Sequence, residues 1–244
     1  MSRQGKFYGI GVGPGPAGLI PVAAVEALRQ SDVIYLPRAR SKEVSVARQC
    51  LAGIDLPTER FQEIEFNMDP DRSVLGEYYG QLARKVAAVL RTGHSVAWLT
   101  IGDSMTYSTY GYLLAALQDE MPDLEQVTFP GVTSFAAIAA ALDFPLGVGK
   151  ERVLILPCPD EMEALRADIL THDIVVLMKI GNRLEAVLAL LNDMEILRLC
   201  VFARRIGLPG ELLCNDLSTL VHDPLNGYLS TMLIRRNPRE KRHP

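Results

Sequence analysis

The chain has 244 residues, of which 48% are hydrophobic and 22% are charged, a composition typical of a folded protein with a substantial core. Its formal net charge of -4 argues against nucleic acid as the main partner, because phosphate binding needs an excess of basic surface. The apolar runs are shorter than the roughly 20 residues of a membrane-spanning helix, and the N-terminal residues show no apolar segment of a secretory signal. We therefore expect a cytoplasmic protein with no membrane partner.

The cysteines and histidines give no sign of a metal site. The four cysteines are scattered without CxxC spacing, and the four histidines form no HExxH pair, so neither a zinc site nor a redox motif is indicated. We expect buried thiols and no bound metal.

The chain alternates apolar runs of strand length with segments of helical periodicity, which predicts an α/β fold with largely parallel strands. The pattern restarts near residue 150, so we expect two α/β domains, over residues 1–124 and 125–244. Strands are expected over residues 6–12, 32–36, 61–66, 96–99, 127–129, 153–156, 174–178, 197–202 and 228–234. Helices are expected over residues 21–30, 73–91, 110–119, 135–142, 160–170 and 182–191.

A glycine-rich turn, Gly13–Gly18, follows the first expected strand and has the spacing of a dinucleotide-binding loop. Pro14 and Pro16, however, lack the backbone N–H groups that such a loop offers to a pyrophosphate. The second strand ends at Arg38 rather than at an acid, which could favour a 2′-phosphate. A tight turn that packs a helix on a sheet is the better interpretation, and an NADP-linked oxidoreductase stays open as an alternative.

The stretch Trp98–Leu113 runs from a buried strand into Gly102-Asp103 and then into a helix that carries several tyrosines. Open α/β sheets bind ligands at the carboxyl ends of their strands, so this loop is a candidate ligand site. Further along, Ser134 is a suitable N-cap for an alanine-rich helix, and the small side chains of that helix would allow close approach of another backbone or of a flat ligand.

Five segments occur in a fixed order along nearly the whole chain. They are Gly11-Val-Gly-Pro-Gly15, Gly102-Asp-Ser-Met-Thr-Tyr-Ser-Thr109, Phe129-Pro-Gly-Val-Thr-Ser134 with Phe144-Pro-Leu146, Val175-Val-Leu-Met-Lys-Ile-Gly181 and Ala203-Arg-Arg-Ile-Gly-Leu-Pro-Gly-Glu211. Each segment alone is weak, but together they resemble the tetrapyrrole (precorrin) methylases. Within that family the similarity is greatest to the precorrin-2 C20-methyltransferases of cobalamin biosynthesis.

The resemblance implies two α/β/α domains with a cofactor cleft between them, in a homodimer. It also implies S-adenosylmethionine as methyl donor, and a tetrapyrrole acceptor, precorrin-2, which is methylated at C20 to give precorrin-3A. Cobalt-precorrin-2, another tetrapyrrole acceptor, or a non-catalytic tetrapyrrole carrier are the alternatives. The catalytic base is not indicated.

Site residues follow from the resemblance position by position. The implied cofactor contacts are Pro14, Ile101, Gly102, Asp103, Thr106, Thr133, Ser134, Met178, Lys179, Arg205, Ser230 and Thr231. For the tetrapyrrole acceptor that the resemblance implies, the candidate contacts are Tyr107, Tyr110 and Lys179, and the candidate partners for its carboxylates are Arg38, Arg40, Lys42, Arg204 and Arg205.

Two positions depart from the family pattern. Most members have proline where this chain has Ser104, so the loop after Gly102 loses one fixed φ angle. Pro16 stands where the family's first turn usually carries an acid, which puts any catalytic role of that acid in doubt for this protein.

Overall fold

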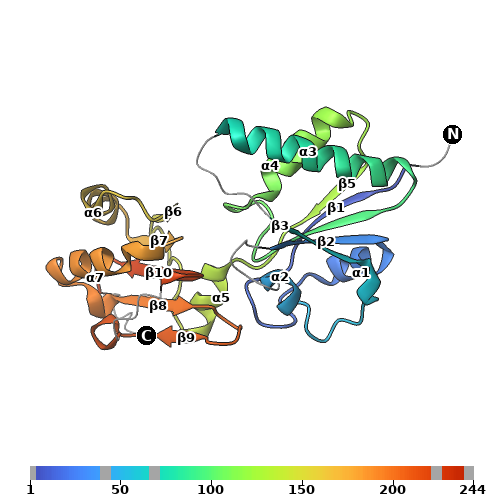
Figure 1. The fold of residues 1–244 in the computed structure, drawn as a ribbon. Helices are drawn as coiled ribbons and strands as arrows, with labels where there is room; N and C mark the ends of the chain where they lie inside the picture. The colour runs from blue at the N-terminus through green and yellow to red at the C-terminus, as the bar shows by residue number, and fades with distance from the viewer. Residues whose placement is uncertain (1–3, 39–44, 66–71, 221–226, 239–244) are drawn as a thin grey trace. The chain divides into compact units, whose positions relative to one another are not determined.

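The computed structural model describes residues 4–38, 45–65, 72–220 and 227–238, and the chain divides into two compact units, Met1–Thr133 and Ser134–Pro244 (Figure 1). Both units are α/β, which confirms the expected fold class. The division follows Thr133 rather than Leu124, because strand β5 (Gln126–Phe129) pairs in parallel with β1 (Phe7–Gly11). The expected substrate contacts Arg40 and Lys42 lie outside the described residues.

The first unit contains a five-stranded sheet in the order β3-β2-β4-β1-β5, and all of its strand pairs are parallel, as predicted. Besides β1 and β5, its strands are β2 (Val33–Arg38), β3 (Phe61–Glu65) and β4 (Val96–Thr100). Its helices are α1 (Val22–Gln30), α2 (Val46–Gln49), α3 (Arg72–Arg91) and α4 (Tyr110–Glu120), with a 3-10 turn at Thr58–Arg60.

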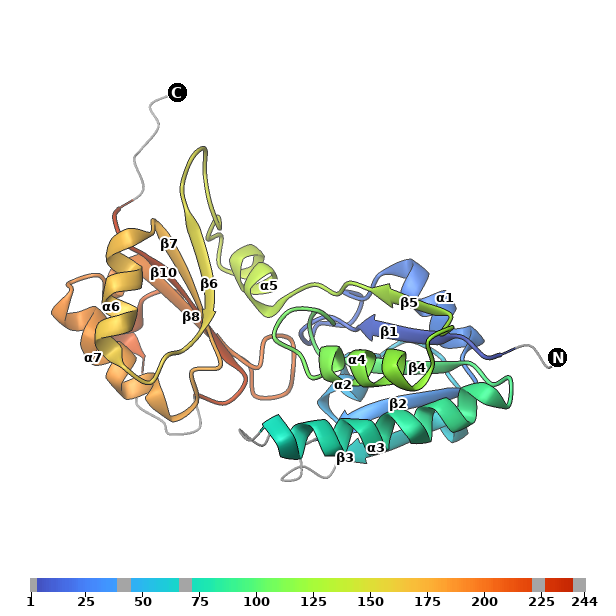
Figure 2. The same cartoon turned by 90° about the horizontal axis from the view of Figure 1, so that it is seen from above.

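Helices cover both faces of this sheet, with α3 and α4 on one face and α1 and α2 on the other (Figures 1 and 2). Strand β4 is buried from Val96 through Leu99, because a parallel sheet covered on both faces needs apolar side chains on both. On the α3/α4 face, Trp98 and Phe7 pack with tyrosines from β2, α3 and α4. The core thus surrounds the strands whose carboxyl ends carry the candidate loop.

The second unit contains a mixed sheet in the order β6-β7-β10-β8-β9. The last strand of the chain, β10 (Ser230–Arg235), lies in its centre, antiparallel to both β7 and β8. All six residues of β10 are buried, which confirms the prediction that this strand is covered on both faces. The other elements are α5 (Ser134–Ala141), β6 (Val153–Pro157), α6 (Met162–Thr171), β7 (Ile174–Met178), α7 (Leu184–Asp193), β8 (Cys200–Arg204) and β9 (Leu212–Cys214), with 3-10 turns at Gly181–Arg183, Leu197–Leu199 and Leu217–Thr219.

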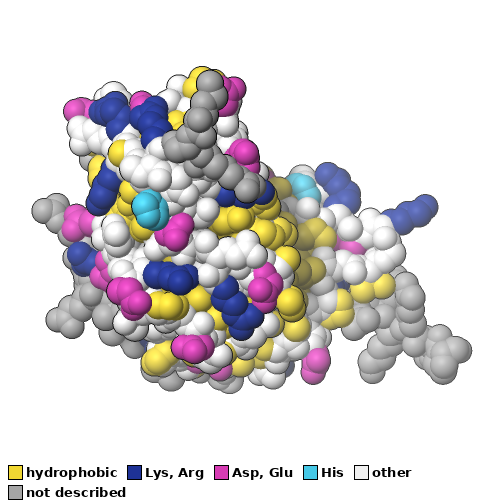
Figure 3. Space-filling view, turned by 90° about the vertical axis from the view of Figure 1, so that its right-hand side faces the viewer, with side chains coloured by type: hydrophobic (Ala, Val, Ile, Leu, Met, Phe, Trp, Pro, Cys, Tyr) yellow, Lys and Arg dark blue, Asp and Glu magenta, His cyan; other side chains and the backbone are white. Residues whose placement is uncertain are grey.

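Charged side chains of both signs lie on the surface, and the cysteines lie in the interior. Acidic and basic side chains lie interspersed on the face shown in Figure 3. All four cysteines are free and buried, as predicted. Within the described residues, the helices are too short or too polar to cross a bilayer, and His, Cys, Asp and Glu side chains form no group of three or more that could hold a metal ion.

Candidate functional site

Three backbone segments meet where strands β1, β4 and β5 end. Gly13 donates from its N–H to the Gly102 carbonyl at 3.1 Å, and Gly102 donates back to the Gly13 carbonyl at 2.7 Å. A Cβ on Gly131 would lie 2.0 Å from the Gly102 oxygen, so only glycine fits there. These glycines let three loops touch through bare backbone at the ligand-binding edge of the sheet.

Asp103 holds this junction together through both carboxylate oxygens. Its Oδ1 accepts from the Met105 N–H at 3.0 Å and from the Thr106 hydroxyl at 2.7 Å. Its Oδ2 accepts from the Gly131 N–H at 2.9 Å. Partial burial raises the pKa of the carboxyl, but these hydrogen bonds outweigh it and leave the pKa below its ordinary value. Asp103 is therefore ionised near neutral pH.

The first glycine turn does not fit a dinucleotide site. The N–H of Gly13 is used in the bridge to Gly102, and the prolines that follow have no N–H to offer. The Arg38 guanidinium forms an ion pair with Glu63, with 3.1 Å between Nε and Oε2. The nicotinamide hypothesis depends on the glycine turn and on Arg38, and both form contacts within the protein instead. The ion pair with Glu63 holds the Arg38 side chain at the edge of the sheet.

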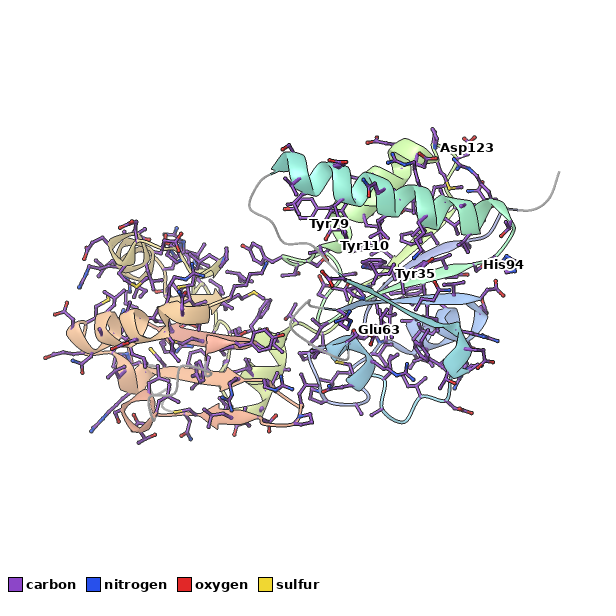
Figure 4. The ribbon with its side chains drawn as sticks, viewed as in Figure 1. Tyr35, Glu63, Tyr79, His94, Tyr110 and Asp123 are labelled. Carbon is purple, nitrogen blue, oxygen red and sulfur yellow. The ribbon has the colours of Figure 1, made fainter. Side chains whose placement is uncertain are left out.

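The two tyrosines expected to contact the substrate, Tyr107 and Tyr110, differ in exposure. Tyr107 has a φ of +50° and is 44% exposed, so it can meet a ligand. Tyr110 is fully buried, stacks on Phe7 and shares a 2.6 Å hydrogen bond with the Thr128 hydroxyl. Figure 4 shows Tyr110 beneath helix α3. The Tyr110 ring fills the space left by Gly9, where a Cβ would lie 2.1 Å from Cζ. Tyr110 therefore packs in the core in this structure, and its contact with the substrate stays a prediction.

The remaining cofactor positions expected in the first unit lie around the same junction. Pro14 is buried directly after the bridged Gly13, while Ile101 and Thr106 are half-buried on either side of Gly102-Asp103. Thr133 is half-buried two residues after Gly131. The structure therefore brings these sequence-predicted residues to one end of one sheet.

The residues predicted in the second unit also gather at one sheet edge. Because β10 is antiparallel to its neighbours, its first residues lie beside the carboxyl ends of β7 and β8: Thr231 pairs with Met178, and Ser230 with Arg204. Lys179 and Arg205 follow directly after those two strand ends.

Hydrogen bonds within the unit define this edge further. The Ser134 and Thr231 hydroxyls lie 3.0 Å apart, and the Ser230 hydroxyl donates to the Gly227 carbonyl at 2.7 Å. The Arg205 Nε donates to the Pro209 carbonyl at 2.7 Å. Ser134, predicted as the N-cap, is the first residue of helix α5, and its hydroxyl bonds to the Thr231 hydroxyl.

Left-handed backbone marks the same edge. Lys179, Arg205 and Leu229 have φ values of +53°, +52° and +51°, a region that residues other than glycine seldom adopt. Such strained residues cluster at functional sites, where the surroundings hold them in place. Leu229 was not predicted from the sequence, since no turn-forming residue type marks its position, and the buried Ser104 was noted only as a departure.

Comparisons with known proteins show the family of this chain. A family model described as Tetrapyrrole (Corrin/Porphyrin) Methylases matches residues 6–220. A cobalt-precorrin-2 C(20)-methyltransferase of Salmonella typhimurium is 29% identical over 96% of this chain and 97% of its own length. A probable cobalt-precorrin-2 C(20)-methyltransferase of Methanocaldococcus jannaschii is 30% identical over 95% of this chain and 96% of its own length.

Solved structures share the fold. A cobalt precorrin-4 methyltransferase superposes with a TM-score of 0.71 at 20% identity and covers 96% of both chains. The uroporphyrin-III C-methyltransferase of Thermus thermophilus, solved with S-adenosylhomocysteine, gives a TM-score of 0.62 at 19% identity over 95% of this chain and 92% of that chain. The fold is thus the two-domain α/β fold of the tetrapyrrole methylases. The chain belongs to the tetrapyrrole methylase family.

Proposed function

We propose that this protein transfers a methyl group from S-adenosylmethionine to C20 of precorrin-2, or of its cobalt complex, in cobalamin biosynthesis. The observation that carries the proposal is similarity over nearly the full chain to two proteins named as C20-methyltransferases of cobalt-precorrin-2. A third relative, from a Sinorhizobium species, is named precorrin-2 C(20)-methyltransferase and is 29% identical over 74% of this chain. We propose a homodimer as the working state, as the family resemblance implies.

The glycine junction of the first unit supports a donor site. A Cβ placed on Gly102 would have only the Val132 oxygen within 4 Å, at 3.9 Å, so no side chain fills the space beside this residue, although the residue itself is buried. A ligand can therefore approach the backbone at Gly102 without meeting a side chain. Asp103 adds a fixed negative charge beside that surface, suited to an ammonium or hydroxyl donor. These features fit the amino-acid portion of S-adenosylmethionine.

When bound, S-adenosylmethionine would supply a sulfonium methyl group to the electron-rich C20 carbon, with the sulfur leaving as neutral S-adenosylhomocysteine and C20 then losing its proton. The chain needs no covalent nucleophile for this, and its main task is to align donor and acceptor. Ile101–Thr106 would hold the donor, and Tyr107 would meet the tetrapyrrole. We propose Met178, Lys179, Arg205, Ser230 and Thr231 as the second unit's contacts to the donor.

Calorimetric titration with S-adenosylhomocysteine tests the donor site directly. Wild-type protein should bind it at micromolar concentration, and Gly102→Ala should bind it at least about tenfold more weakly, because the added methyl group would occupy the space beside the Gly102 backbone. Gly53→Ala is a matched control, because Gly53 also has positive φ and open space around it. No binding by the wild type would refute the proposal.

Product mass tests the reaction. Incubation of the protein with S-adenosylmethionine and precorrin-2, in metal-free and cobalt forms, should add one methyl mass, located at C20. Turnover of only one form would identify the acceptor. Saturable binding of NADPH without methyl transfer would favour the oxidoreductase alternative instead.

A further inference from the structure

Ser104 is a buried polar residue inside the candidate donor loop. Its side chain is 0% exposed, and its hydroxyl donates to the Phe129 carbonyl at 2.9 Å, across 25 residues of sequence. A buried hydroxyl is costly unless it is hydrogen-bonded, so this bond connects the loop to the end of β5.

The neighbouring contacts form a continuous set. Asp103 accepts from Gly131 at 2.9 Å, so two consecutive loop residues bond to Phe129, the last residue of β5, and to Gly131, two residues further on. The Ser108 hydroxyl donates to the Ser104 carbonyl and accepts from the Tyr110 N–H at 3.2 Å, which joins the loop to the start of α4. Ser104 lies in the middle of this set, with one bond from its side chain and one to its backbone.

We infer that Ser104 is a positioning residue that fixes the Gly102-Asp103 loop against Phe129–Gly131, so that the donor meets a preformed backbone surface. This rests on the proposed function. A loop that is already ordered loses less conformational entropy when the ligand binds. The family's usual proline restrains the loop through its fixed φ, whereas this chain restrains it through a buried hydrogen bond.

The test compares three variants of the full chain. Ser104→Ala removes the bond, and Ser104→Pro restores a restraint without the hydroxyl. Ser31→Ala is the matched control, because Ser31 is also 0% exposed and donates to a backbone carbonyl, that of Ala27, at 2.8 Å. Amide hydrogen exchange is measured without ligand, and affinity for S-adenosylhomocysteine is measured by calorimetry.

Ser104→Ala should exchange faster than wild type at residues 102–106 and at Gly131, and should bind S-adenosylhomocysteine about five- to tenfold more weakly. Ser104→Pro should recover most of that affinity, and Ser31→Ala should match wild type in both measurements. Unchanged exchange in Ser104→Ala, or equal loss of affinity in Ser31→Ala, would overturn the inference. Wild-type protein that binds no S-adenosylhomocysteine refutes the proposed function alone, and the exchange data still decide whether Ser104 fixes the loop.

Discussion

Replacement of Asp103 by asparagine should destabilise the first unit by about 2 kcal/mol near neutral pH. The carboxylate accepts three hydrogen bonds, two at Oδ1 and one at Oδ2. An asparagine amide has one oxygen, so its NH₂ group must face either the Gly131 N–H or the pair of donors at Met105 and Thr106. One hydrogen bond lost with its donor unsatisfied costs about 1–3 kcal/mol, and the remaining bonds lose the strengthening from ionic charge.

The pH dependence of the unfolding free energy gives a second, independent test of this prediction. The pKa of Asp103 in the folded protein lies below its ordinary value of 3.8. The carboxylate's contribution to stability is therefore complete above that value and is lost as pH falls through the lower, folded pKa. The difference in unfolding free energy between wild type and Asp103→Asn should be largest at pH 6–7 and should shrink towards pH 3.

Urea unfolding at each pH, with Asp32→Asn as control, measures this difference. The Asp32 carboxylate accepts from the Ser95 N–H at 2.8 Å, at an exposed site, so its replacement should cost less than that of Asp103. A loss below about 0.5 kcal/mol in Asp103→Asn would refute the argument from three hydrogen bonds. A difference that stays constant from pH 7 to pH 3 would refute the assignment of an ionised, stabilising carboxylate.

Three further substitutions test the site. Gly131→Ala should lower the free energy of unfolding by about 2–3 kcal/mol, because its Cβ would lie 2.0 Å from the Gly102 oxygen; wild-type stability in urea would contradict the close approach. Tyr110→Phe should cost about 1 kcal/mol through its lost bond to Thr128 and leave methyl transfer unchanged; a stable but inactive variant would return Tyr110 to the substrate site. Arg38→Ala should change stability by less than about 1 kcal/mol, since its ion pair is partly exposed; a larger loss in urea would show a structural role for the pair.

Much of the fold could be predicted from local patterns. The parallel first sheet followed from apolar runs separated by helical periodicity, and Gly102-Asp103 was recognisable because a strand ended in a residue type suited to close backbone approach. The start of β8 was placed too early, at Leu197 rather than Cys200, because Leu197-Arg198-Leu199 forms a 3-10 turn instead. Strand β9 was missed because three residues are too few to show a period.

The features of the site that the sequence did not show have a non-local cause. An aromatic residue at the start of a helix can equally face a ligand or the core. The Tyr110 ring turns to the core because Gly9, on a strand far away in sequence, leaves space for it. Similarly, the bond from Ser104 joins its loop to Phe129 at the end of β5, 25 residues later, so no short window of sequence shows it. The antiparallel direction of β10 also escaped prediction, because burial on both faces does not fix strand direction.

The central place of β10 affects how the protein folds during synthesis. The first unit's strands are all complete by Phe129, so its sheet can form while the rest of the chain is still being made. The second sheet lacks its middle strand until Arg235 has been added, and β7 and β8 then have an unpaired edge each. Unpaired strand edges promote aggregation, so nascent chains that stall before Ser230 should depend on chaperones much more than chains that stall after Arg235.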